Sequence, residues 1–283
     1  MTVATAGPDY ALQGEYAAVG VGANIIALGD GNFRLVVHQG GLPGAGWDKS
    51  PKSEAEGKLA NEVVRFKELG ELKGGVLTVN GAALQRLERH SPTEGAKAPA
   101  EAVILFDGSQ ADDWNGGHLD DRKLLAAGTT SKQAFQGFTL HLEFLLPFKP
   151  HGRGQGRANS GVYIQNRYEL QVLDSFGLKG LDNECGGVYQ NSAPSVNMCF
   201  PPLQWQTYDV DFTAAKFGPD GKKTANASLT VKHNGVVVQD NLALKGATPG
   251  GGFKGEVPTP GPFQLQGHGN PVYYRNIWVI EKK

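Results

Sequence analysis

The sequence has few of the residues that would fix its redox state or point to a charged partner. Two cysteines, two methionines and 19% charged residues occur among 283 positions. The 27 basic and 28 acidic residues nearly cancel, so the chain lacks the positive charge with which proteins bind nucleic acid or an anionic membrane surface. No window approaches the 18 or more apolar residues of a membrane span. We therefore expect neither a nucleic-acid partner nor a membrane span.

The two cysteines, Cys185 and Cys199, lie in a glycine-rich segment that reads as a loop. A disulfide between them would close a modest loop, stabilise the fold by about 3 kcal/mol and indicate a periplasmic or extracellular location. Two free, partly buried thiols in a cytosolic protein are the alternative. The first residues lack the basic and apolar regions of a signal peptide. The predicted location, periplasmic or extracellular, therefore depends on the disulfide.

Glycine and proline, in contrast, are abundant. Their 40 and 16 residues favour turns over long helices, and short apolar runs between turn signals recur along the whole chain. Near residues 91–100 (SPTEGAKAPA) the sequence turns small and polar, as expected of a linker. We predict an all-β protein with a small β-meander domain over residues 1–100, of which 91–100 form the linker, and a β-sandwich or jelly roll over residues 101–283.

Two features of the first domain can be checked individually. Asn80-Gly81 separates two apolar runs and predicts a two-residue type I′ hairpin, since this turn needs positive φ at both central residues. Residues 49–58 are strongly charged, and we expect them to form a surface loop. The N-terminal domain could serve as a substrate lip, an oligomer contact or a tether, and the sequence leaves its role and the oligomeric state open.

In the second domain, side chains alternate between apolar and polar along several predicted strands. One strand would place His141 and Glu143 opposite an apolar face, a second would do so for Glu169 and Gln171, and a third for Gln266, with His268 just beyond it. A half-exposed sheet is the ordinary explanation of such alternation. Carboxylates, carboxamides and imidazole, however, are suited to hydrogen bonding with a polyhydroxylated ligand, and Tyr163 and Tyr189 could stack on sugar rings. These features point to a carbohydrate site.

The same segments carry a resemblance to a known family. LFDGSQADDW, NSGVYIQNRYELQVLD, WQTYDVDF and GPFQLQGHGNPVYYRNIWV occur in order over residues 103–281. Together they resemble the 3-keto-disaccharide hydrolase domain family. The resemblance implies a concanavalin-like jelly roll that acts on glycosides oxidised at carbon 3. Because the ketone acidifies the C2 proton, a base can remove it and the enolate can expel the C1 substituent, so the net reaction is elimination or, after water addition, hydrolysis.

Residue roles follow from the motifs as hypotheses. Glu169 is the favoured base and His268 the acid or a ligand, while Arg275 would stabilise the enolate or orient Glu169, and Glu143 is an alternative base or a metal ligand. The remaining predicted substrate contacts are polar side chains of the same segments: Gln171, Asp174, Asn159, Tyr163, Gln266, Tyr189 and His141. No cofactor is implied with certainty. A divalent metal is an alternative if His141, Glu143, Glu169 and His268 meet on one face.

Two other functions remain open. Residues 169–174 (ELQVLD) have the spacing of the Glu-x-Asp-x-x-Glu signature of laminarinase-like retaining glycosidases, but Gln171 and Asp174 replace the middle Asp and the last Glu. A non-catalytic carbohydrate-binding module is the other alternative, because concanavalin-like sheets also bind sugars without cleaving them.

Overall fold

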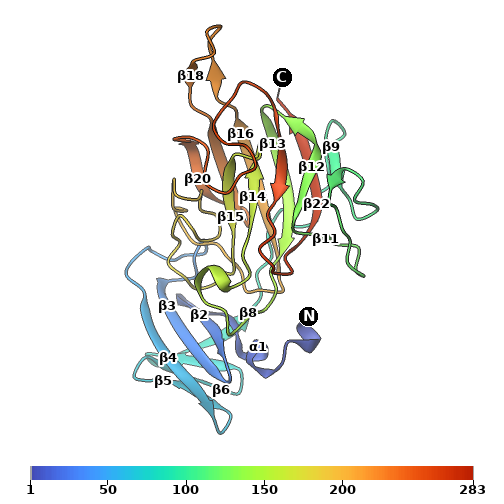
Figure 1. The fold of residues 1–283 in the computed structure, drawn as a ribbon. Coiled ribbons are helices and arrows are strands. Elements are labelled where there is room, and N and C mark those ends of the chain that lie inside the picture. The colour runs from blue at the N-terminus through green and yellow to red at the C-terminus, as the bar shows by residue number, and fades with distance from the viewer. Residues whose placement is uncertain (1, 283) are drawn as a thin grey trace.

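The computed structural model describes residues 2–282, which form a small closed β-barrel and a larger β-sandwich. The barrel lies against one end of the sandwich (Figure 1). Each body has its own hydrophobic cluster, and Ile26 and Val36 of the barrel pack into the cluster of the sandwich. The described helical segments are short: η1 (Val3–Thr5), α1 (Pro8–Leu12) and η2 (Gly154–Gly156). The predicted all-β fold class is confirmed.

The barrel is a meander whose first and last strands pair with each other. Its strands follow one another in chain order: β1 (Gly14–Ala18), β2 (Gly20–Gly29), β3 (Asn32–Gly40), β4 (Ser53–Ala60), β5 (Val63–Phe66), β6 (Gly70–Lys73), β7 (Val76–Val79) and β8 (Ala82–Leu87). Pairing of Tyr16 with Arg86 joins β1 to β8. Closure leaves no unpaired sheet edge in this small domain.

The hairpin predicted at Asn80-Gly81 is present. The two residues have φ values of 48° and 82° and join β7 to β8 in an antiparallel pair. Positive φ at both positions is the backbone of a type I′ turn, for which Asn followed by Gly is the favoured sequence.

The surface loop predicted for residues 49–58 is wrong in its second half, because Ser53–Ala60 form strand β4. The outward side chains of this strand are charged, which hid it in the sequence. Its inward positions, Ala55, Gly57 and Leu59, are small or modest in size, and a Cβ on Gly57 would lie 2.4 Å from the carbonyl oxygen of Arg65. The strand therefore alternates as a barrel strand does, but its inward side chains are too small for the sequence to identify them as core.

The sandwich has two main antiparallel sheets. The five-stranded sheet has the order β10 (Trp114–Asn115), β12 (Thr129–Phe135), β21 (Gly261–Leu265), β14 (Ser160–Ile164) and β15 (Tyr168–Val172). The seven-stranded sheet has the order β11 (Leu125–Ala126), β22 (Tyr273–Glu281), β13 (Phe138–Leu145), β16 (Trp205–Thr213), β19 (Ser228–His233) and β20 (Val236–Ala243), with β9 (Val103–Phe106) also paired to β22. A separate ribbon joins β17 (Lys216–Phe217) and β18 (Lys223–Ala225).

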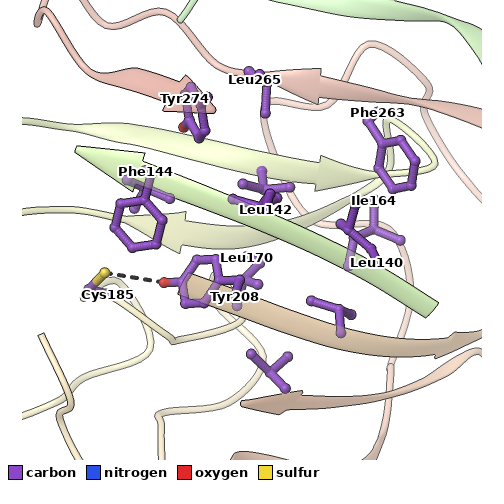
Figure 2. Packing of buried hydrophobic residues seen from close by; sticks show 14 of the residues in the cluster. Leu140, Leu142, Phe144, Ile164, Leu170, Cys185, Tyr208, Phe263, Leu265 and Tyr274 are labelled. Carbon is purple, nitrogen blue, oxygen red and sulfur yellow. Dashed lines mark hydrogen bonds between the residues drawn. The ribbon is translucent and has the colours of Figure 1, made fainter. Parts of the chain in front are cut away.

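The apolar faces predicted from alternation meet between the two sheets. Leu140, Leu142 and Phe144 of β13 are buried against Leu170 and Leu265 of the opposite sheet, and Figure 2 shows these side chains in one layer. Burying them removes apolar surface from water, the main source of stability in such a sandwich. Glu169, Gln171 and Gln266 therefore face away from the core on the five-stranded sheet, and His141 and Glu143 do so on the seven-stranded sheet.

Candidate active site

The outer face of the five-stranded sheet carries a cavity of about 300 Å³, which is within the size range of small-molecule sites. It brings together seven of the residues predicted from the sequence: Asn159, Tyr163, Glu169, Gln171, Tyr189, Gln266 and His268. Gln155, Pro249 and Gly250 complete the lining. Carboxamide, phenol and carboxylate groups thus dominate the cavity wall.

The register of β14 and β15 places the central pair of side chains. Tyr163 lies directly across from Glu169, and Gly161 directly across from Gln171. Directly opposed residues of antiparallel strands point to the same face and contact each other. The Tyr163 hydroxyl accordingly donates a hydrogen bond to Oε2 of Glu169 at 2.7 Å.

Glu169 is 4% exposed although it lines the cavity. Burial raises the pKa of its carboxyl to about 7, against the smaller, opposing effect of the hydrogen bond from Tyr163. A carboxylate in this pKa range is a stronger base than an ordinary glutamate, and about half of it is ionised near neutral pH. The group is therefore suited to accepting a proton from a bound ligand.

Two glycines make room for this pair. A Cβ on Gly161 would lie 2.5 Å from Oε1 of Glu169, and one on Gly250 would lie 2.5 Å from the Tyr163 hydroxyl oxygen. Gly250 also has φ +85°, a conformation that other residues rarely adopt. Neither position accepts a side chain without displacing the Glu169–Tyr163 pair.

A chain of carboxamides lines the cavity beside Glu169. The Nε2 group of Gln155 donates to the carbonyl of Asn183 at 2.8 Å, which leaves Oε1 of Gln155 as an acceptor for Nδ2 of Asn159 and Nε2 of Gln171, both at 3.0 Å. The Oε1 atoms of Gln171 and Gln266 are buried without a hydrogen-bond partner. Buried acceptors of this kind favour a ligand that supplies hydroxyl donors.

His268 and Tyr189 reach the cavity from loops. His268 follows β21 in an exposed, glycine-flanked segment, and Asn270 Nδ2 donates to its backbone carbonyl at 3.0 Å. The backbone N–H of Tyr189 donates to the carbonyl of Glu169 at 3.1 Å, which fixes the tyrosine beside the carboxylate strand. His268 is the one cavity-lining side chain among the described residues that can carry positive charge.

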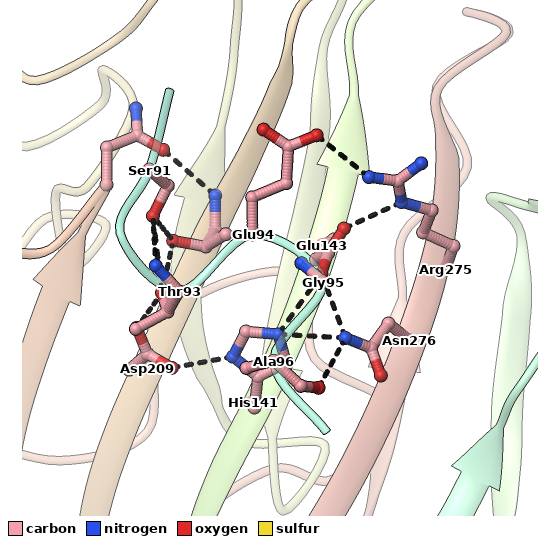
Figure 3. A network of polar contacts seen from close by, with 12 residues as sticks. Ser91, Thr93, Glu94, Gly95, Ala96, His141, Glu143, Asp209, Arg275 and Asn276 are labelled. Atoms are coloured by element: carbon pink, nitrogen blue, oxygen red, sulfur yellow. Dashed lines mark hydrogen bonds and ion pairs between the residues drawn. The ribbon is translucent and has the colours of Figure 1, made fainter. Parts of the chain in front are cut away.

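The structure does not bring Glu143, Arg275 and His141 into this cavity. They lie on the outer face of the seven-stranded sheet, under residues 91–96 of the predicted linker (Figure 3). The Gly95 N–H donates to Oε1 of Glu143 at 2.6 Å, and Nε of Arg275 donates to Oε2 at 2.6 Å. Burial would raise the pKa of Glu143, but its donors, with His141 first among them, lower it to about 2. Such a carboxylate is a weak base.

His141 is held within the same cluster. Its Nδ1 lies 2.6 Å from Oδ1 of Asp209 and its Nε2 lies 3.4 Å from Oε1 of Glu143. Burial opposes the charged form, but the two carboxylates outweigh it and raise the pKa of His141. The alternative in which His141 and Glu143 meet Glu169 on one face is not the arrangement found, because β13 and β15 belong to different sheets. Alternation separates inward from outward side chains and does not tell to which of the two sheets they belong.

Asp174 is also outside the cavity. Its Oδ2 accepts a hydrogen bond from Nε of Arg157 at 2.7 Å, and both side chains are buried. Arg157 continues to the barrel, where Nη1 donates to the carbonyl of Ala27 at 3.1 Å. The predicted substrate contact is therefore replaced by an ion pair at the junction of the two domains.

The predicted disulfide is not formed, because Cys185 and Cys199 are free, buried thiols. Cys185 Sγ lies 3.2 Å from the Tyr208 hydroxyl within the core (Figure 2). The periplasmic or extracellular location rested on the disulfide and stays a prediction. Within residues 2–282 no group of three or more His, Cys, Asp or Glu side chains is placed to hold a metal ion, since His141 and Glu143 are on a different sheet from Glu169 and His268.

The barrel supports the loop that carries Gln155. The Nη2 group of Arg153 donates to the carbonyl of Leu28 at 2.9 Å, and His151 packs against Gly29 so closely that a Cβ there would clash. Sequence reasoning missed Gln155, Pro249 and Gly250 as cavity residues. Hydrogen bonds from Asn159 and Gln171 hold Gln155 in the cavity wall. Its loop has no periodic pattern from which this position could be predicted. The triplet Gly250-Gly251-Gly252 was a detectable sign of a close approach.

The fold and site define a β-sandwich protein with a polar, carboxylate-bearing cavity on the outer face of one sheet. A family model described as a 3-keto-alpha-glucoside-1,2-lyase-like domain matches residues 101–280. The chain belongs to this family.

Solved structures extend the comparison. A crystal structure described as a "putative glycosyl hydrolase" from Parabacteroides distasonis ATCC 8503 is 33% identical, with a TM-score of 0.60, over 65% of this chain and 85% of that one. A second one, described in the same words from the same organism, is 18% identical with a TM-score of 0.45 over 65% of this chain and 94% of that one. No curated protein matches the sequence. None of the helices in the described part of the chain is long and apolar enough to cross a membrane.

Proposed function

We propose that the protein cleaves 3-keto-glycosides, with Glu169 as the base that removes the C2 proton. The observation that carries this proposal is the buried Glu169 carboxylate, with a pKa near 7, in a cavity of hydrogen-bonding side chains on the outer face of the five-stranded sheet. The family match names the 3-keto-glucoside chemistry.

The 3-ketone makes such cleavage possible with one carboxylate. Deprotonation at C2 gives an enolate whose charge is delocalised onto the C3 oxygen, and the enolate re-forms the ketone by expelling the C1 oxygen with its bonding pair. The C2 proton moves to Glu169. The leaving oxygen needs a proton, which His268, whose side chain lines the cavity, supplies from its protonated ring and so becomes a neutral imidazole. Addition of water to the unsaturated product would make the net reaction a hydrolysis.

Other lining groups would hold the substrate. The unpartnered Oε1 atoms of Gln171 and Gln266 accept from sugar hydroxyls, and Tyr189 offers a ring and a hydroxyl at the rim. Arg275 cannot stabilise the enolate from the opposite sheet, so the charge that develops on the C3 oxygen would be met by hydrogen-bond donors of the cavity.

The test is to incubate the purified protein with a 3-keto-glucoside and with its unoxidised parent, and to follow both by mass spectrometry. We expect loss of the keto substrate alone and formation of a 2-hydroxy-3-keto-glycal or its hydration product. Loss of the unoxidised parent would instead support a conventional glycosidase. Binding of a glycoside without turnover of either compound would support a carbohydrate-binding module.

A conventional retaining glycosidase is the weaker candidate because it needs two carboxyl groups about 5 Å apart. Glu169 is the one carboxylate among the described residues that line the cavity, and Asp174, the second carboxylate of the sequence signature, is paired with Arg157.

A further inference from the structure

The hydroxyl of Tyr163 has two acceptors and one proton. It lies 2.7 Å from Oε2 of Glu169 and 2.8 Å from the carbonyl oxygen of Pro249, and the geometry of each contact allows the hydroxyl to donate. A tyrosine hydroxyl donates a single hydrogen bond and accepts up to two. Burial raises the pKa of Tyr163 far above neutrality, so the proton stays on the hydroxyl. Its two acceptors therefore compete for it.

The protonation state of Glu169 decides this competition. When Glu169 is ionised, it can only accept hydrogen bonds. Because the bond from Tyr163 to this carboxylate is charge-assisted and therefore the stronger one, the hydroxyl donates to Glu169, and the Pro249 carbonyl is left to solvent. When Glu169 is protonated, its own O–H donates to the Tyr163 oxygen, and the Tyr163 proton turns to Pro249. Gln266 Nε2, 3.3 Å from the hydroxyl, donates to it in both states.

Residues 248–250 run along one side of the cavity, which Pro249 and Gly250 line, and further hydrogen bonds hold the segment at both ends. The Glu169 N–H donates to the Thr248 hydroxyl at 2.8 Å and the Thr248 N–H to the carbonyl of Arg167 at 2.8 Å. Beyond Gly250, the Gly252 N–H donates to Oδ1 of Asn166 at 2.8 Å. The bond from Tyr163 is the contact that ties the middle of this wall to the sheet.

We propose that Tyr163 is a positioning residue that ties the wall of residues 248–250 to strand β14 when Glu169 carries a proton and releases it when Glu169 is ionised. If Glu169 is the base of the proposed reaction, the wall tightens around the intermediate as soon as the C2 proton has been taken. It loosens again when Glu169 has lost this proton to solvent and is ionised. The coupling itself needs no substrate.

Three other elements bring titratable groups near Glu169. Tyr189 comes from the loop after β15, His268 from the loop after β21, and Tyr274 from β22 of the opposite sheet. Burial raises the pKa of Tyr274 well above its usual value, so it keeps its proton over the range in which Glu169 titrates. His268 lines the same cavity, and a His268→Gln background removes this imidazole from the test.

The experiment is amide hydrogen exchange of Thr248, Gly252 and Phe253 at pH 5 and pH 9, corrected for the chemical exchange rate, while amides of β16 and β19 report global opening. In the wild-type protein and in the His268→Gln protein we expect exchange about fivefold faster at pH 9, the factor that corresponds to one neutral hydrogen bond. Glu169→Gln, whose amide donates to Tyr163 as a protonated Glu169 does, should exchange slowly at both values.

Tyr163→Phe should exchange fast at both values, because it has no proton to offer Pro249. Equal protection of the wall in Tyr163→Phe and wild-type protein at pH 5 would overturn the proposal. The proposal would also be overturned if, in the wild-type protein, the corrected exchange rates of the wall amides changed with pH no more than those of the β16 and β19 amides. The readout uses no substrate, so a protein that turns over no 3-keto-glucoside can still show the coupling, and an active one can fail to show it.

Discussion

Tyr163 and Glu169 face each other across β14 and β15, with the phenol hydroxyl 2.7 Å from the carboxylate. Burial raises the pKa of this glutamate to about 7, although the hydrogen bond from Tyr163 acts in the opposite direction. Glu143, an equally buried glutamate on the other sheet, accepts hydrogen bonds from Gly95, Arg275 and Asn276, which help to bring its pKa down to about 2. We therefore expect the two carboxylates to differ in what they contribute, one to chemistry and the other to stability.

Replacing each glutamate by glutamine separates these contributions. Glu169→Gln should lower kcat on a 3-keto-glucoside by about 10²–10⁴, the range for loss of a general base, without loss of folded structure. Glu143→Gln should keep kcat within a few-fold but lower the free energy of unfolding by about 2–3 kcal/mol, since hydrogen bonds to a charged group are lost. Steady-state kinetics and urea unfolding of both variants are the measurements. A Glu143→Gln protein that is stable but inactive would refute the assignment.

Ionisation of Glu169 should make the protein less stable as pH rises. An ordinary salt-bridged carboxylate has the opposite effect. The pKa of Glu169 is raised from 4.5 to about 7 by burial, so between these values the unfolded chain binds fewer protons than the folded one. The free energy of unfolding therefore falls as pH rises through this window, by about 3 kcal/mol in total from this group.

Glu169→Gln removes that contribution and serves as the comparison. The difference in unfolding free energy between wild-type and Glu169→Gln protein, measured in urea at pH 5 and pH 8, should shift by about 2.5 kcal/mol in favour of the variant at pH 8. Glu143 stays ionised throughout, because its lowered pKa is about 2. A difference that does not change with pH would show that Glu169 has an ordinary pKa.

Gly161→Ala tests the space beside the carboxylate. The added methyl would lie 2.5 Å from Oε1 of Glu169, so the carboxylate must move. A displacement of the order of 1 Å in a reacting group can cost about 10²-fold in rate, and we expect kcat/KM to fall by that order. Gly137→Ala is the matched control, because its Cβ meets no atom closer than 3.6 Å. Equal activity of the two variants would mean that Glu169 is not the reacting group.

Asp174→Asn distinguishes a structural from a catalytic carboxylate. The substitution leaves the buried Arg157 without its charged partner and should lower the free energy of unfolding by about 3 kcal/mol. Turnover of a 3-keto-glucoside by the folded variant should stay within tenfold of wild type. A retaining glycosidase that used Asp174 as its second carboxylate would instead lose activity without a comparable loss of stability.

We predict that Cys185 and Cys199 are free thiols in solution. Both thiols are buried, so a thiol reagent should label neither in the folded protein and both after unfolding. The unfolding midpoint should be the same with and without reductant. A protein that shows no titratable thiol after unfolding, and a lower midpoint with reductant, would restore the disulfide and with it the argument for an oxidising compartment.

Alternation along the chain was sufficient to predict the apolar layer and the outward direction of Glu169, Gln171 and Gln266. It failed for β4, whose inward side chains are small, and it could not tell that Glu143 leaves the other sheet. Nothing in the local sequence showed that residues 91–96 would lie over the seven-stranded sheet. These residues satisfy the Glu143 cluster through Gly95 and Glu94, contacts that span 48 and 181 residues of sequence.

The all-β class, the apolar faces of the strands and the chemical groups available for a carbohydrate site follow from the sequence alone, because side-chain period and turn residues act locally. Which of those groups meet depends on how the strands pack in three dimensions. Strand order and sheet packing put Tyr163, Glu169, Gln266 and His268 around one cavity, and they put Glu143 and Arg275 on the opposite side of the sandwich. The raised pKa of Glu169 comes from that arrangement, since burial is a property of everything packed around a residue and not of its neighbours in sequence.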